Sequence, residues 1–150
     1  MPARTYEDEG AAMLEFALVF VVFLVVVFGI VDFGLAISAN TQISNAGREG
    51  ARMATLVSDP VAVEQRIRDS ASGQLNPALL TVTIECVEPG GNPCVKASVS
   101  APAGDLRNAE PGDKARITVG YPYTLLTPLP GFINVDSLVD LRSITEMRIE

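Results

Sequence analysis

The chain has 150 residues and a formal net charge of −7, from 11 basic and 18 acidic side chains. This length suits one modest domain with an anchor, and the acidic balance argues against a nucleic-acid partner, which needs basic surface to displace counterions from phosphate groups. The absence of histidine removes the commonest general base and metal ligand, and two cysteines alone cannot complete a four-ligand zinc site. Composition therefore favours a protein that is not an enzyme and that needs no cofactor or metal.

A polar segment, residues 1–10, precedes a long apolar run. Fourteen of the sixteen residues from Phe16 to Val31 are Val, Phe, Leu or Ile, and none is charged. Their summed insertion free energy, roughly 4 to 8 kcal/mol, exceeds the cost of about 2.5 to 3.5 kcal/mol for one buried carboxylate. The sequence predicts a membrane-spanning helix, because only a helix pairs all backbone groups of a lone segment in lipid. Its sixteen residues rise about 24 Å, which puts Glu15 and Asp32 near opposite bilayer edges; the alternative is a buried core helix.

The same helix is expected to continue beyond the membrane to residue 57, because residues 35–57 contain no proline. Mostly small residues recur there at spacings of three and four and mark one helix face. Such a face allows close approach of another chain or of this chain's own C-terminal domain. We favour the second interpretation, since a sheet needs a helix to cover it. The face consists of Ile43, Ala46, Gly47, Gly50, Ala54 and Val57.

A short second helix is predicted after Ser58, with Asp59 as its cap and Pro60 in its first turn. It extends from Val61 to about Ser72 and ends at Gly73. The remainder alternates between apolar and polar residues in about four segments, which predicts antiparallel strands around Leu80–Cys86, Val95–Val99, Ile117–Tyr121 and Val139–Ile149. Two Pro-rich stretches, residues 101–114 and 122–134, are expected to be loops.

Cys86 and Cys94 flank a turn rich in Pro and Gly. Such a turn brings its ends together, so we expect a disulfide, which belongs in an oxidising compartment. The alternative is two unpaired thiols. Because Cys86 is in phase with the apolar side of its strand and Cys94 is out of phase with Val95, a β-bulge near the turn is also expected.

The spacing of Gly10 and Glu15 is the most informative motif. Glycine closes a short polar leader, glutamate is the fifth residue after it, and the apolar helix follows. This is similar to the prepilin cleavage pattern. Residues 10–54, which include the stretch NAGREGAR at 45–52, resemble the TadE-like family.

The resemblance implies a pilin-like α+β fold, in which a long N-terminal transmembrane helix packs on a small sheet. Its parts would be a leader (1–10), a helix (11–57) and an extracytoplasmic domain (58–150). It implies a pseudopilin, a minor structural component in assembly of a tight-adherence (type IVc) pilus or related secretion machine. The protein would lie in the bacterial inner membrane, and its partners would be other pilin subunits, a prepilin peptidase and the assembly platform.

The resemblance also assigns roles to three residues. The peptidase would cut between Gly10 and Ala11, and Glu15 would pair with the new amine of a neighbouring subunit. Ala11 and Glu15 are one turn apart on one face, and a carboxylate in the first turn favours the positive end of the helix dipole. The alternative is a carboxylate that merely marks the headgroup region.

Three further charged residues are candidate partner contacts: Asp32, Arg48 and Arg52. Asp32 is either a boundary residue or a partner for one of these arginines in a neighbouring chain. For the arginines the alternative is an internal pair, because Glu49 and Arg52 are three residues apart on the helix.

Three other functions stay open. The leader has one basic and three acidic side chains, so the positive-inside rule does not support a cytoplasmic N-terminus. A membrane-anchored extracytoplasmic binding domain unrelated to pili would need neither Gly10 nor Glu15. A secreted protein cut after Ser38 conflicts with the acidic leader. The third function, an enzyme, has no support, because no spacing marks a catalytic site.

Overall fold

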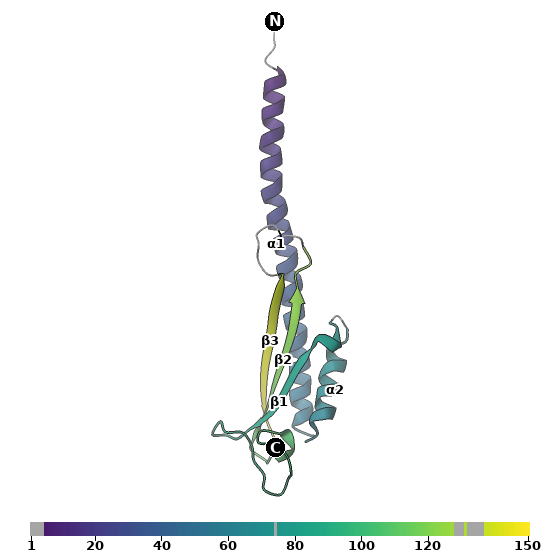
Figure 1. Cartoon of the computed structure of the whole chain (residues 1–150), viewed down its shortest axis with the longest axis vertical. Coiled ribbons are helices and arrows are strands. Elements are labelled where there is room, and N and C mark those ends of the chain that lie inside the picture. The colour runs from purple at the N-terminus through teal and green to yellow at the C-terminus, as the bar shows by residue number, and fades with distance from the viewer. Residues whose placement is uncertain (1–4, 74, 128–130, 132–136) are drawn as a thin grey trace.

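The computed structural model describes residues 5–73, 75–127, 131 and 137–150. A long helix runs the length of the molecule, and a small sheet and a second helix pack on the half distant from the N-terminus (Figure 1). The elements are α1 (Thr5–Ala54), α2 (Pro60–Ala71), the 3-10 turns η1 (Pro77–Leu79) and η2 (Leu106–Asn108), and the strands β1 (Thr81–Val87), β2 (Lys114–Thr124) and β3 (Leu138–Arg148). This confirms the expected α+β architecture. Residues 1–4 of the expected leader, and 128–130 and 132–134 of the expected second loop, lie outside the described residues.

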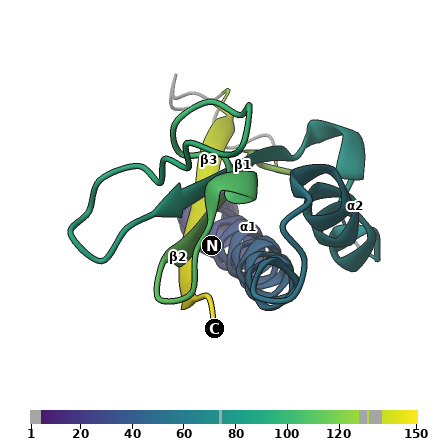
Figure 2. The same ribbon diagram turned by 90° about the horizontal axis from the view of Figure 1, so that it is seen from below.

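The helix α1 is continuous for 50 residues, which corresponds to about 75 Å. It begins at Thr5, inside the expected leader, so no break in secondary structure marks residue 10. It ends at Ala54, three residues before the expected end, where the amides of Leu56 and Val57 both bond to the carbonyl of Met53. This tight turn redirects the chain into α2, which packs back beside α1 (Figure 2).

The expected cap of the second helix is confirmed. The Asp59 carboxylate accepts a hydrogen bond from the amide of Val61 at 3.0 Å, and Pro60 occupies the first turn. The cap satisfies one of the free amides at a helix start, and proline fits there because its position needs no N–H donor. The helix ends at Ala71, one residue before the expected end.

In the described part of the chain the sheet has three antiparallel strands in the order β1-β2-β3, one fewer than the roughly four expected. The missing strand is Val95–Val99, where the amide of Val99 bonds to the carbonyl of Lys96 in a turn. Its place beside β1 is taken by a loop, because the amide of Cys86 bonds to the carbonyl of Gly104 at 2.7 Å. Alternation over five residues was therefore an insufficient signal between two prolines.

Strand β2 extends further than expected, through Pro122 and Tyr123 to Thr124. Proline lacks the N–H that a central strand position would need. However, β1 pairs with β2 only as far as Gly120, so β2 has a neighbour on one side alone at Pro122. Edge positions of this kind tolerate proline.

The small-residue face of α1 packs on the chain's own domain, as favoured above. Ile43, Ala46 and Ala54 are buried. A side chain added at Gly50 would have its Cβ 2.3 Å from Cγ1 of Ile67, so α2 approaches this helix too closely for any residue but glycine without displacement. Val57, at the end of the expected face, is exposed instead.

Candidate membrane and assembly site

The first half of α1 projects away from the domain (Figure 1). The helix is long and apolar enough to cross a membrane, and none of its most apolar 18-residue window is buried within the chain. Most apolar side chains from Met13 to Val31 are exposed, and only Leu24, Val27 and Phe28 among them are half-buried. Contiguous apolar surface of this extent indicates contact with something other than water, so the helix indicates a single-pass membrane protein.

Gly10, Ala11 and Glu15 lie at the outer end of this helix, and all three are exposed. A Cβ built on Gly10 meets nothing within 4 Å. Among the residues that the structure describes, the Glu15 carboxylate has no hydrogen bond or ion pair. Whatever Glu15 binds must therefore come from outside this part of the chain.

Three phenylalanines form a stacked row directly after Glu15. The ring centroids of Phe16 and Phe20 are 5.7 Å apart, and those of Phe20 and Phe23 are 6.4 Å apart. Sequence reasoning treated these residues only as apolar, although their spacing of three and four residues places them on one face. All three rings are exposed, so this aromatic face is available to lipid or to a neighbouring helix.

Asp32 is bound within the chain, at the junction between the apolar half of α1 and the domain. It is only 6% exposed. Its Oδ1 accepts hydrogen bonds from the amides of Leu126 at 3.1 Å and Thr127 at 3.2 Å, and its Oδ2 accepts one from the Thr127 hydroxyl. We call this set of three bonds the Asp32 clip. No sequence pattern indicated it, because the partners are 94 and 95 residues away.

Tyr123 lies on β2 just before the residues of the Asp32 clip, close enough to be affected by the charge of Asp32. Its pKa is raised, chiefly by burial and then by the negative charge of Asp32. Both effects disfavour the phenolate. Tyr123 is a half-buried aromatic group beside α1.

Arg48 and Arg52 lie about four and a half and five and a half turns beyond Asp32 on α1. Both are exposed, one turn apart on the same face, and neither has an ion-pair partner in the described part of the chain. Among the described residues Glu49 forms no ion pair with Arg52, the alternative left open above, and instead contacts Arg66 of α2 at 2.5 Å. The hydrogen bond and positive charge of Arg66 lower the pKa of the Glu49 carboxyl, and the charge of Arg52 adds only a smaller effect. The guanidinium groups of Arg48 and Arg52 remain available to a partner.

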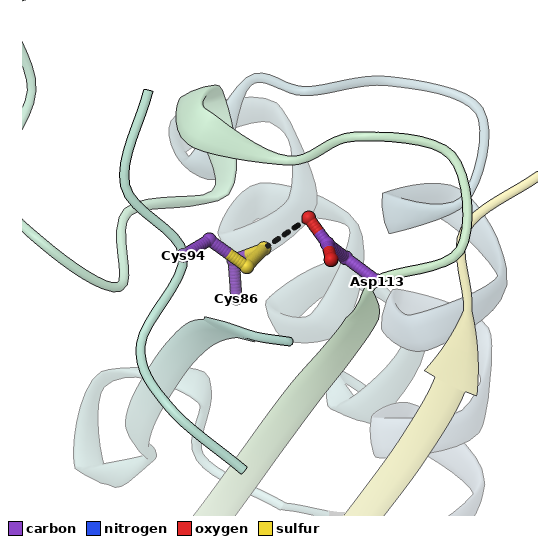
Figure 3. A group of neighbouring side chains, drawn as sticks. All are labelled: Cys86, Cys94 and Asp113. Atoms are coloured by element: carbon purple, nitrogen blue, oxygen red, sulfur yellow. Dashed lines mark hydrogen bonds between the residues drawn. A yellow bond between two sulfur atoms is a disulfide. The ribbon is translucent and has the colours of Figure 1, made fainter. Parts of the chain in front are cut away.

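Cys86 and Cys94 form the expected disulfide, with their Cα atoms 5.4 Å apart and both residues buried. The expected bulge was wrong, because β1 stays in register with β2 through Val87, and Cys94 lies in a loop rather than a strand. Figure 3 shows Asp113 turned toward the bond, with its Oδ2 3.8 Å from Sγ of Cys86. Ligand atoms of these three residues lie within 4.8 Å of one another, but the sulfurs bond to each other and leave no thiolate for a metal. The disulfide therefore holds the loop that contains Cys94 against β1.

The greater part of α1 matches the model of a known sequence family. Residues 10–52 match the family model described as TadE-like protein, which confirms the resemblance of this segment. The match includes Gly10, Glu15, Asp32, Arg48 and Arg52. No curated protein and no solved structure matches the chain.

Proposed function

We propose that this chain, whose residues 10–52 are TadE-like, is a pseudopilin, a minor structural subunit in assembly of a tight-adherence (type IVc) pilus or related secretion machine. Its role would be structural rather than enzymatic. The observation that carries the proposal is the Glu15 carboxylate, which is exposed on an apolar helix five residues after Gly10 and has no partner among the described residues.

The arrangement suits a prepilin peptidase substrate. Cleavage after Gly10 would create a charged amine at Ala11, four residues before the Glu15 carboxylate. Because Glu15 has no partner in the described chain, it is available to the corresponding amine of a neighbouring subunit. A carboxylate near the positive helix end and an amine in low-dielectric surroundings attract each other strongly. Lateral alignment of two such helices would satisfy both charges.

The domain would lie outside the cytoplasm, with the leader inside. The buried disulfide supports this orientation, since such bonds persist in oxidising compartments. The exposed pair Arg48 and Arg52 would then face other pilin subunits or the assembly platform. A membrane-anchored extracytoplasmic binding domain unrelated to pili remains the alternative, and the acidic leader does not decide between the two, because both need a cytoplasmic N-terminus.

Intact-mass spectrometry of the membrane-extracted protein, co-expressed with a prepilin peptidase, tests the proposal. We expect a chain that begins at Ala11. The control is Gly10→Val, which should stay uncut; because nothing lies within 4 Å of a Cβ there, the substitution leaves the folded chain undisturbed. A wild-type chain that retains its leader in the presence of active peptidase would contradict the proposal and leave the anchored binding domain.

A further inference from the structure

The charge-free apolar run is too short for the bilayer it would cross. Its sixteen residues rise about 24 Å, against about 30 Å of hydrocarbon. Exposed apolar side chains resume directly after Asp32, with Phe33 70% exposed and Ile37 52% exposed. Extending the span to Ile37 gives about 33 Å. The bilayer edge on the domain side then falls beyond Asp32.

The carboxylates at the two ends of the run differ in the free-energy cost of entering lipid. Asp32 already accepts three hydrogen bonds from its own chain, whereas Glu15 accepts none in the described chain. A hydrogen-bonded polar group costs less to remove from water than an unpaired one. The missing length is therefore supplied at the Asp32 end.

The Asp32 clip brings other apolar side chains to the same depth. Leu126, whose amide donates to Asp32, is 76% exposed. Leu138 and Val139, at the start of β3, pair with Thr124 and Tyr123 at this end of the sheet, and both are exposed. The half-buried Tyr123 adds an aromatic side chain of the kind enriched at membrane interfaces.

We infer that this end of the β2–β3 sheet, marked by Leu126, Leu138 and Val139, sits in the headgroup and acyl boundary of the bilayer, and that the Asp32 clip holds it there. The partner is the lipid surface, because the Leu126 amide bonds to Asp32, where the exposed apolar segment of the spanning helix meets the domain. The inference rests on the membrane span and not on the pilus role. It makes Asp32 a positioning residue that sets the height of the domain above the membrane.

Tryptophan fluorescence tests the inference, since the chain contains no tryptophan of its own. The reporter is Leu126→Trp, and the matched control is Leu56→Trp, at a leucine of similar exposure (81%) just beyond the far end of α1. The full chain is reconstituted in phosphatidylcholine vesicles with bromine at defined acyl depths. We expect quenching of the reporter at position 126 alone, strongest for bromines about 5–10 Å below the headgroups.

Two outcomes would overturn the inference. Quenching at position 126 no stronger than at position 56 would place Leu126 in water. Blue-shifted emission without bromine quenching, rising with protein-to-lipid ratio, would assign the patch to a second copy of the chain. Neither outcome would affect cleavage at Gly10, so the proposed function is tested separately.

A second variant tests the clip itself. Asp32→Ala in the Leu126→Trp background removes all three bonds, and we expect the bromine quenching to fall toward that of the Leu56→Trp control. Folding is checked by resistance of the buried disulfide to reductant, since Cys86 is inaccessible in the folded domain. Unchanged quenching in a folded Asp32→Ala chain would refute the positioning role of Asp32.

Discussion

The two halves of α1 belong to one helix but are built from different residues. Before Asp32 the helix carries large Val, Phe and Leu side chains, most of which are exposed. From Ala39 to Ala54 its inward face carries Ala, Gly and one Ile, all buried. Lipid accommodates bulky side chains in any direction, whereas a sheet and α2 on one side require a close approach. The kind of surface that covers each half has decided its composition, although both halves have the same backbone.

The largest effect should come from Glu15→Gln, which keeps the shape and removes the charge. We expect loss of pilus assembly with no change in domain stability beyond about 0.5 kcal/mol, because the side chain contacts nothing in the described chain. Piliation by electron microscopy and thermal unfolding in detergent check the two parts. Normal piliation would contradict the assembly role of Glu15. Reduced stability would contradict the statement that its side chain contacts nothing in the described chain.

The next effect sharpens the comparison with one chemical change in each half. Gly50→Ala should destabilise the domain by about 1–3 kcal/mol, because its Cβ would lie 2.3 Å from Ile67. Gly34→Ala should not destabilise it, since nothing lies within 4 Å of a Cβ there. Thermal unfolding of both variants by circular dichroism in the same detergent measures the difference. Equal stability of the two variants would mean that α2 shifts without cost.

The smallest effect concerns pH and the pair of Glu49 with Arg66. Arg66 holds the pKa of Glu49 below its ordinary value of 4.5, so the ionised form is favoured in the folded state. The pair therefore stabilises the fold above pH 4.5, and this contribution disappears as the pH falls through the folded-state pKa. Glu49→Gln should lose slightly less stability than wild type between about pH 5 and pH 3, as measured by unfolding midpoints. A steeper loss of stability in the variant would contradict this direction. Because the pair is exposed, the difference between the two proteins should be small.

Local patterns predicted local structure well. The cap at Asp59, the spacing of small residues around Gly50 and the alternation along β1 each report interactions within a few residues, or the periodicity of one buried face. The turn between Cys86 and Cys94 was short enough to predict its disulfide. These signals sufficed for the α+β architecture and for the TadE-like segment.

Long-range contacts were not predictable in the same way. The Asp32 clip joins residues more than ninety positions apart, and Glu49 binds Arg66 only because α2 folds back along α1. No periodicity encodes either contact. The pattern at Val95–Val99 failed for the opposite reason: it was locally strand-like, but the loop that includes Gly104 occupied the edge of β1. Competition for a sheet edge is decided by the whole fold.

The unbroken helix makes the molecule a lever. From Asp32 to Ala54 the rod is about 33 Å long, so a change of roughly 20° in the tilt of the span would carry its far end about 11 Å sideways. A membrane-spanning helix adjusts to differences in bilayer thickness chiefly by tilting. The position of the disulfide loop, far from any lipid, would thus register the thickness of the membrane in which the chain is anchored.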